Sequence, residues 1–503
     1  MMSRGKSSIQ NTVIALISEI VVTFVGLLFP RALILNYGSE ANGLITSLQQ
    51  VIQYLTLLDA GLSGAAIFAL YKPLAENDNQ RIREILYSAK KLYSKIGGIF
   101  VGCILISAIA YPLFIAETGY SVQTVTFLFL LTGMNSATQF LFIGKYKLLL
   151  NASQNNRYVS AINSLSTCIY SLVIIIAAYS GLELLIAIAL GTIAYLIRAC
   201  AYYIACKKLF PQYDYAPTKR KYYFKNQKEV FIQQILSLLI LNSSTLILAF
   251  TKTSMIEISV FTVYNMILTA VFLITNAVNS GISASFGDLI ARNDIERLRK
   301  VYYEYEVLFQ IFWTVIFSCV LVLYQPFIEL YSRDFSDAVY SRPMLCILFS
   351  LLGAIWVIRN QQSVIIVAAG RFQDIQKGSI IEAVLTVGLS LIGLVFLGID
   401  GIILGRIIAA TYRMIDFILY CNKNIIQIEP KYTFYQIGIS ITNIIFIYIF
   451  SRIVMHFLVI NTYFEWMLCA TIIGCVSIVS SILINVIVNR NQMKSILNRI
   501  KII

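Results

Sequence analysis

The chain of 503 residues has a formal net charge of +14, and 58% of its residues are hydrophobic while 13% are charged. Soluble domains carry about 25% charged residues, and a soluble fold could not bury so much apolar surface. The composition therefore excludes a soluble protein. The positive charge has to be placed relative to membrane spans before it can be interpreted as a nucleic-acid site.

Apolar windows bounded by polar or basic residues recur along the whole chain. A spanning helix with a short connection takes roughly 30 residues, so the length allows about fourteen to sixteen spans. Uninterrupted apolar runs predict helices, because the strands of a membrane barrel would alternate. We predict an all-α integral membrane protein with about fourteen transmembrane helices, near residues 10–36, 43–70, 93–115, 122–149, 158–180, 183–206, 229–250, 257–285, 301–329, 341–369, 377–398, 401–421, 433–458 and 465–488.

The connections between these spans alternate in charge. Those that follow even-numbered spans, together with the C-terminal tail, carry most of the Lys and Arg residues outside the spans. The other connections are short and nearly free of them, with Lys252, Arg333 and Arg342 as the exceptions. Because cytoplasmic loops carry the excess of Lys and Arg, both termini are predicted to be cytoplasmic and the number of spans to be even.

An internal repeat and a long polar connection predict the domain organisation. Asn77–Arg83 follows the second span, and the similar Asn293–Arg299 follows the eighth at an offset of 216 residues. Six spans separate the pair, so the halves should have the same orientation, as in transporters built of parallel repeats. We predict an N-terminal lobe (1–209), a cytoplasmic linker (210–228), a C-terminal lobe (229–425), and a segment (426–503) with two further spans and a basic tail.

Residues that would indicate an enzyme are scarce. None of the nine cysteines forms a C-x-x-C pair, and the single histidine, His456, has no apparent nucleophile partner. No nucleotide-binding motif occurs. We therefore predict neither catalytic residues nor metal ligands, and we interpret Gly401 and Gly405 as a G-x-x-x-G motif that lets two helices approach closely.

Polar residues recur at helical spacing inside the second and eighth spans. Each polar group in hydrocarbon needs a partner or water, and residues three or four apart share a helix face. The second span carries Asn42, Thr46, Gln49, Gln53, Thr56 and Ser63 with Asp59 beside them, and the eighth carries Thr262, Asn265, Thr269, Asn276, Asn279 and Ser283. Such faces in two equivalent helices predict the walls of a central cavity; the alternative is hydrogen bonding between helices within each lobe.

Charged residues inside spans are functional candidates by default. They are Glu19 and Arg31 in the first span, and Arg359, Glu382, Arg406, Arg413 and Asp416 in the tenth to twelfth. The cations suit an anionic headgroup such as a phosphate. Arg413 and Asp416, one turn apart, could instead neutralise each other. Arg198 and Lys145 are expected to snorkel to the inner face and are discounted.

Residues 31–62 carry a family resemblance. Arg31-Ala32-Leu33, Tyr37-Gly38, Gly43-Leu44, Tyr54-Leu55 and Leu57-Leu58-Asp59-Ala60-Gly61-Leu62 resemble the opening of bacterial polysaccharide exporters of the Wzx type. These are lipid-linked oligosaccharide flippases of the multidrug, oligosaccharidyl-lipid and polysaccharide exporter (MOP) superfamily. The resemblance implies two lobes that enclose a cavity and alternate between inward and outward states, and it carries over Arg31, Asp59 and Gly61.

The expected function is therefore translocation of an undecaprenyl-diphosphate-linked oligosaccharide to the outer leaflet, for capsule, O-antigen or exopolysaccharide assembly. The candidate cavity residues are Arg31, Gln49, Gln53, Asp59, Asn276, Asn279, Arg359, Arg406 and Arg413. No cofactor is expected, although Glu19 or Asp59 could couple transport to a proton or sodium gradient. The expected setting is a monomer in the bacterial cytoplasmic membrane, in contact with membrane lipids and with the polysaccharide polymerase machinery as a further partner, and without nucleic acid.

Three alternatives remain open. Within the superfamily they are a lipid II flippase and a MATE-type drug or cation antiporter. From another class comes a membrane-embedded polysaccharide polymerase or ligase. Such enzymes need a sizeable outer loop, and no predicted outer loop exceeds roughly 15 residues, so we predict that the protein is not an enzyme.

Overall fold

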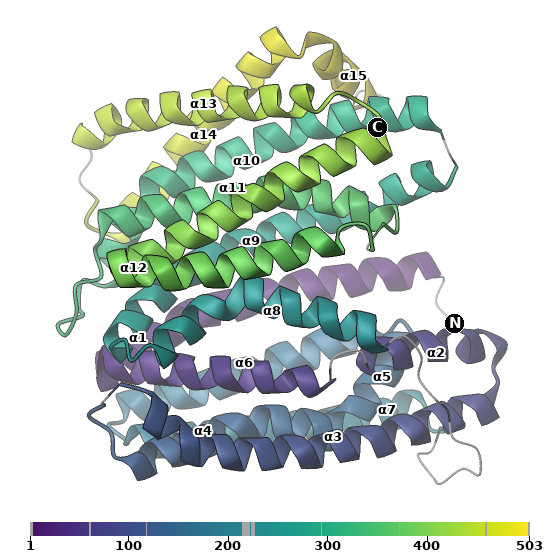
Figure 1. Cartoon of the computed structure of the whole chain (residues 1–503), viewed down its shortest axis with the longest axis vertical. Helices are drawn as coiled ribbons and strands as arrows, with labels where there is room; N and C mark the ends of the chain where they lie inside the picture. The colour runs from purple at the N-terminus through teal and green to yellow at the C-terminus, as the bar shows by residue number, and fades with distance from the viewer. Residues whose placement is uncertain are drawn as a thin grey trace. The chain divides into compact units, whose positions relative to one another are not determined.

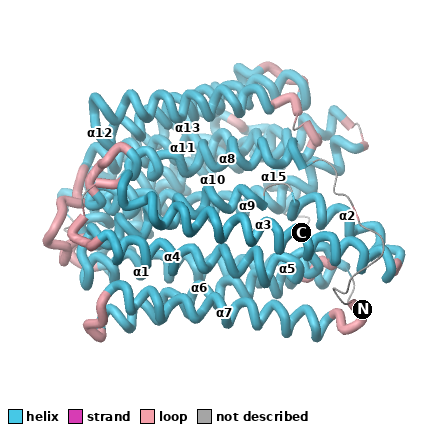
Figure 2. Tube along the Cα trace, turned by 60° about the horizontal axis from the view of Figure 1, so that its bottom comes forward, coloured by secondary structure: helices cyan, strands magenta, loops and turns pink. Residues whose placement is uncertain are grey.

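The computed structural model describes residues 4–59, 62–116, 118–213, 222, 227–292, 294–371, 373–457 and 460–500. Helices account for nearly all of these residues, and loops are confined to the helix ends (Figure 2). No strand occurs in these ranges, as expected for a chain whose backbone polar groups must be satisfied locally in hydrocarbon. The described part of the chain forms two compact units, residues 1–263 and 264–503.

The first unit contains eight helices and the start of a ninth (Figure 1). They are α1 (Arg4–Leu55), α2 (Leu62–Glu76), α3 (Asn79–Phe114), α4 (Val122–Thr138), α5 (Gly144–Ala152), α6 (Asn156–Tyr179), α7 (Leu184–Leu209), α8 (Gln227–Phe250) and the first residues of α9 (Met255–Ala291). A 3-10 turn, η1 (Thr56–Asp59), follows α1, and a π-helical turn, η2 (Gln139–Ile143), joins α4 to α5. Helix α8 packs on α1 and η1, which places it in this unit.

The second unit is built around α10 (Ile295–Tyr331), which packs against α11 (Pro343–Ala368), α13 (Pro430–Phe457) and α14 (Tyr463–Val488). Figure 1 shows α10 among these helices. In chain order, the long α12 (Gln376–Cys421) and the π-helical turn η3 (Asn422–Ile426) come between α11 and α13, and α15 (Arg490–Ile500) is the last described helix. The predicted lobe boundary at 210–228 stays a prediction, since most of this linker lies outside the described residues.

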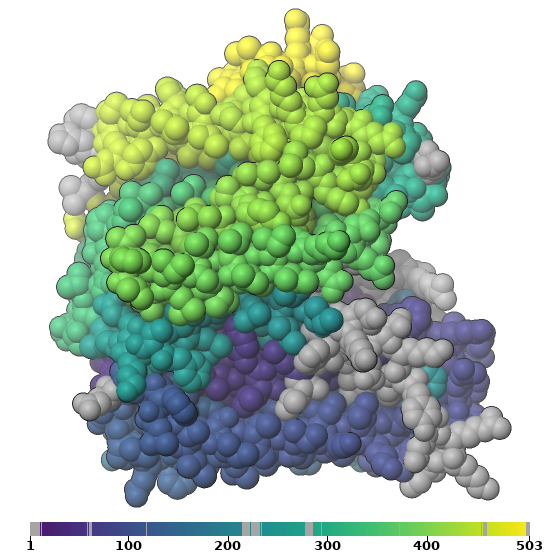
Figure 3. Space-filling view, in the orientation of Figure 1, coloured from purple at the N-terminus to yellow at the C-terminus, as the bar shows by residue number. Residues whose placement is uncertain are grey.

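The described helices can be assigned to the fourteen predicted membrane spans. Eleven described segments are long and apolar enough to cross a membrane. Two of them, Val13–Leu55 and Gln376–Ile426, are divided by the non-helical residues Gly38 (φ 86°) and Gly398 (φ 61°), which gives thirteen. The shorter apolar helix Gln234–Phe250 is the fourteenth among the described residues. Large apolar side chains on these helices are exposed, such as Val395 (80%) and Phe396 (78%) on α12, which lies on the face seen in Figure 3.

The second predicted span departs from the expectation. A single helix over 43–70 was predicted, but α1 ends at Leu55, the 3-10 turn follows, and α2 starts at Leu62. The polar face therefore ends at Thr56, and Ser63 belongs to another helix. Gly61 lies outside the described residues. The break puts Asp59 at a helix interruption, which in membrane proteins is tolerated where the backbone is covered by protein or lines a cavity.

The repeated Asn-Asp motif forms the same structure at both of its positions. The side chain of Asp78 accepts a hydrogen bond from the backbone N–H of Arg81 at 3.0 Å and caps α3. The side chain of Asp294 accepts from the N–H of Arg297 at 3.1 Å and caps α10. Because an N-cap satisfies a backbone donor that the helix itself cannot, the repeat conserves a helix start on the basic side of the membrane.

Buried polar pairs join the two appended spans to each other and to α10. Gln436 and Asn489 exchange two amide hydrogen bonds, at 2.7 and 3.0 Å. Asn443 donates to Ser481 at 2.9 Å, and Ser440 donates to Gln310 of α10 at 2.7 Å. In hydrocarbon such pairs hold helices together, since an unpaired amide would be costly there. Helices α13 and α14 are thus an integral part of the second unit.

Candidate functional site

The second unit contains a cluster of four charged side chains from α11 and the two halves of α12. Arg359 pairs with Glu382, whose other oxygen lies 3.5 Å from Nε of Arg413. Arg413 in turn bonds Asp416 at 2.5 Å. The side chains of Arg413 and Glu382 are 1% and 3% exposed, whereas Arg359 is 12% and Asp416 37% exposed. The two middle residues, Glu382 and Arg413, are therefore buried, and the two end residues, Arg359 and Asp416, are partly exposed.

The hairpin within α12 explains why these residues meet. Its two halves turn at Gly398, and they approach so closely that a Cβ on Gly401 would collide with the backbone of Gly393. This confirms the close approach predicted from the glycine motif. Glu382 and Arg413 lie nearly equally far in sequence from the turn at Gly398, so at 1.5 Å per residue both sit about 22–24 Å from it along their helices.

The guanidinium of Arg413 has several partners. Besides its two carboxylate partners, its Nη2 donates to the carbonyl of Ile375 at 2.9 Å and to the hydroxyl of Ser379 at 2.6 Å. Phe417 lies beneath it, with the ring centroid 4.1 Å from Cζ. The predicted pairing of Arg413 with Asp416 is confirmed. In this arrangement Arg413 holds the hairpin together, and its role in substrate binding stays a prediction.

Helix α11 contacts α9 close to Arg359. Asn360, next to Arg359 in sequence, donates to the side-chain oxygen of the exposed Asn276 at 2.8 Å. Trp356 lies under Arg359 at 5.3 Å and stacks on Phe272 of α9 at 4.0 Å. Two residues predicted for the cavity, Asn276 and Arg359, are thereby brought to the same α9–α11 contact. The side chain of Asn279 lies outside the described residues.

Gly378 leaves the space that the guanidinium of Arg413 occupies. A Cβ at this position would collide with Nη1 of Arg413 and would lie 2.5 Å from Oδ2 of Asp416. Gly378→Ala should therefore lower the free energy of unfolding by about 1–3 kcal/mol, as overpacking of a filled site does. Gly388→Ala in the same helix half meets nothing within 4 Å and is the matched control. Thermal unfolding in detergent measures the stability of both variants. Equal unfolding midpoints for the two would contradict the tight packing of Arg413 against Gly378.

The first unit has a polar pocket where the second span is interrupted. A cavity of about 330 Å³ is lined by residues of α1, η1, η2 and α8. These are Gln53, Thr56, Leu57, Asp59, Gln139, Phe140, Gln234, Ser237 and Leu238. Two of the predicted cavity residues, Gln53 and Asp59, are thus in one site. At 1.5 Å per residue Asp59 lies about 30 Å from Ser39, close to the basic side of a hydrocarbon layer of that thickness.

Asp59 is only partly satisfied in this pocket. The hydroxyl of Tyr93 donates to its Oδ2 at 3.4 Å, while its Oδ1 is buried with no hydrogen-bond partner among the described residues. Lys147, in α5, lies near enough to Asp59 for their opposite charges to attract each other. A buried carboxylate oxygen without a donor is costly and favours a bound cation, proton or hydroxyl. The pocket could therefore take a ligand that donates hydrogen bonds or carries positive charge.

Sequence reasoning missed several of these groups. Gln139, Gln234 and Ser237 lie within predicted spans, and their polarity was the signal that could have found them. Lys147 lies at the end of the predicted span 122–149 and was not named as a site residue. Arg198 was expected to snorkel, but it is half-buried and donates to the backbone carbonyl of Asn135 at 3.0 Å. That carbonyl lies just before the π-helical turn.

The remaining predicted residues lie apart from both sites. Arg31 is half-buried and follows Pro30 within α1. Glu19 and Gln49 are exposed on the two halves of α1. Arg406 is 6% exposed on α12, two turns from Arg413 toward the hairpin turn. Asn42, the first residue of the polar stripe, is buried and donates to Ser259 of α9 at 2.8 Å, so it bonds another helix; the predicted alternative placed such bonds within one predicted lobe, and this bond joins residues assigned to different ones.

The fold defines a class of protein, the multi-span helical membrane proteins. No protein-family model and no curated protein sequence matches the chain. Among solved structures it is similar to the lipid II flippase MurJ in an inward closed conformation, at 14% identity and a TM-score of 0.67, over 96% of this chain and 100% of that one.

The chain is also similar to a MATE family multidrug resistance transporter of the MOP superfamily, at 15% identity and a TM-score of 0.61, over 82% of this chain and 93% of the other. A MATE transporter from Vibrio cholerae gives a TM-score of 0.55 at 15% identity, over 85% and 98%. The chain therefore shares the fold of these solved transporters. These identities are low enough that the likeness concerns the fold.

Proposed function

We propose that the protein is a flippase that moves a polyprenyl-diphosphate-linked oligosaccharide across the membrane for surface polysaccharide assembly. The observation that carries this proposal is the Arg359 end of the charged cluster, where the guanidinium lies over Trp356 and the next residue of α11, Asn360, donates to Asn276 of α9. A guanidinium recognises phosphate oxygens bidentately, and amides can both donate to and accept from sugar hydroxyls. A site that binds a sugar linked to a diphosphate needs both kinds of group.

The same cluster argues against an antiporter that binds an organic cation in the second unit. A cation site needs a carboxylate that is open to the ligand, but both oxygens of Glu382 contact arginines and Asp416 contacts Arg413. The substrate of a lipid II flippase also carries a polyprenyl diphosphate. Because this chain is similar in fold to the lipid II flippase MurJ, lipid II flipping is the second candidate function. The resemblance of residues 31–62 favours the oligosaccharide branch.

Deletion of the gene in its native host separates these functions. The proposal expects complete lipid-linked oligosaccharide units to accumulate in the cytoplasmic leaflet, with cell-wall synthesis unaffected. Accumulation of lipid II in that leaflet would favour the second candidate. Outward-facing, unpolymerised units would indicate a polymerase, and unchanged lipids with increased drug sensitivity would indicate an antiporter; either result contradicts the proposal.

A further inference from the structure

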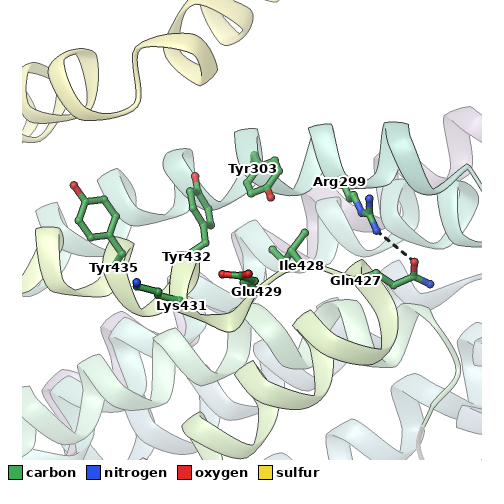
Figure 4. Close-up of a pocket in the computed structure, with 8 residues that line it drawn as sticks. All are labelled: Arg299, Tyr303, Gln427, Ile428, Glu429, Lys431, Tyr432 and Tyr435. Carbon is green, nitrogen blue, oxygen red and sulfur yellow. Dashed lines mark hydrogen bonds between the residues drawn. The ribbon is translucent and has the colours of Figure 1, made fainter.

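A second polar cavity lies in the second unit, away from the charged cluster. It occupies about 530 Å³ between the first turns of α10 and the turn that leads from η3 into α13. Figure 4 shows Arg299 and Tyr303 on α10 facing Gln427, Glu429, Lys431 and Tyr435 across it. Nothing in the proposed transport function uses this site.

The walls of this cavity are held in place by the chain itself. Gln427 has a left-handed backbone (φ 58°) that ends η3, and the N–H of Ile428 returns to the carbonyl of Asn422 at 2.9 Å. Arg299 donates from Nε to the carbonyl of Ile426 at 3.1 Å and from Nη2 to the side-chain oxygen of Gln427 at 3.4 Å. The cavity is therefore preformed, with one Arg299 nitrogen, Nη1, making no hydrogen bond to the described residues.

Distance along the helices places this cavity in the headgroup layer. Tyr303 precedes the outer end of α10, Tyr331, by about 42 Å, and Lys431 precedes Phe457 of α13 by about 39 Å at 1.5 Å per residue. A bilayer has roughly 30 Å of hydrocarbon and about 40–45 Å with its headgroups. The cavity thus lies beyond the hydrocarbon, on the side that carries the Lys and Arg excess, which is predicted to be cytoplasmic.

The lining suits a singly charged phosphodiester that also bears a hydroxyl. Arg299 and Lys431 supply two positive charges and Glu429 one negative charge, and the structure shows no ion pair of Lys431 or Glu429 among the described residues. The cations can contact a phosphate, the carboxylate can accept from a headgroup hydroxyl, and the tyrosine rings suit the boundary of the membrane. The net charge of +1 would favour a monoanion over a diphosphate.

We propose that this cavity binds the headgroup of an anionic phospholipid of the phosphatidylglycerol class from the adjoining leaflet. The depth of the cavity favours a lipid over a free phosphate ester, because its polar groups sit where headgroups lie. Basic pockets between spanning helices on the cytoplasmic side are a known means of holding such lipids. The bound lipid would join the start of α10 to the start of α13.

Native mass spectrometry of the purified full-length chain tests this assignment. Phosphatidylglycerol should bind more tightly than zwitterionic phosphatidylethanolamine, and Lys431→Gln should weaken its binding roughly fivefold. Lys423→Gln is the matched control, since Lys423 is exposed on η3 and does not line the cavity. Lys431 is preferred over Arg299 for the test because Arg299 also supports the turn.

Three results would overturn the assignment. Equal weakening by Lys431→Gln and Lys423→Gln would show diffuse attraction to basic residues. Equal binding of the two phospholipids would show that the cavity does not select an anionic headgroup. Displacement of the lipid by millimolar glycerol phosphate would identify a site for a soluble phosphate ester. Because the measurement involves no transport, its outcome is independent of the proposed flippase activity.

Discussion

Glu382→Ala should destabilise the protein by about 3–5 kcal/mol, because it leaves two arginines in the membrane interior without their shared carboxylate. Arg413 is 1% exposed, so its charge cannot be compensated by water, and Arg359 would lose its only ion-pair partner among the described residues. Thermal unfolding in detergent and the yield of membrane-inserted protein measure the loss. Transport should fall with it.

Two further variants separate the architecture of the cluster from its function. Asp416→Asn removes a charge at the 37% exposed edge and should cost about 1 kcal/mol or less, as exposed ion pairs do. Replacing Arg359, Glu382 and Arg413 together by Leu, Leu and Met removes every buried charge of the core and should recover most of the stability. This triple variant should remain inactive, because Arg359 is the proposed phosphate contact. A Glu382→Ala protein as stable as the wild type would contradict the cluster's structural role.

Asp59→Asn should reduce transport roughly tenfold to a hundredfold while leaving the fold intact. The amide has the shape of the carboxylate and can still accept the hydrogen bond from Tyr93, whereas the charge available to a ligand of the pocket is lost. The pocket already surrounds Asp59 with polar groups, so the unfolding midpoint should change little. Transport is measured under an imposed proton or sodium gradient.

Glu19→Gln is the matched control for this prediction. Glu19 is exposed on the first half of α1 and lines neither described pocket, so its amide variant should transport nearly as well as the wild type. Tyr93→Phe removes one long hydrogen bond and should have an intermediate effect. Wild-type transport by Asp59→Asn would remove this residue from the mechanism and with it the role assigned to the polar pocket.

The spans were predictable because a hydrocarbon environment imposes a length and a composition on every helix. Even the division of α1 and α12 into two spans each was visible, since Gly38 and Gly398 lie in short loops free of Lys and Arg. The end of α1 at Leu55 was not visible. The turn at Thr56–Asp59 lines a pocket together with η2 and α8, which come from distant parts of the chain, so its surroundings could not be inferred from the local sequence.

The sequence indicated which residues belong to the candidate sites, but not which of them contact one another. Intramembrane charge pointed to Arg359, Glu382 and Arg413, yet their partners depend on how the α12 hairpin folds back, and the carbonyl of Ile375 carries no signal in a sequence. A polar stripe likewise does not distinguish Asn42, which is used in packing, from Gln53, which lines a pocket. Both lie on the same helix face, and only the neighbouring helices decide their roles.

Transbilayer movement in proteoliposomes tests the central proposal most directly. The purified chain would be reconstituted with a fluorescent polyprenyl-diphosphate oligosaccharide, and the fraction reaching the opposite leaflet would be measured by chemical quenching. We expect movement that is fast relative to protein-free vesicles and is lost in the Arg359, Glu382 and Arg413 triple variant. Equal rates with and without protein, or equal rates for wild type and triple variant, would contradict the account.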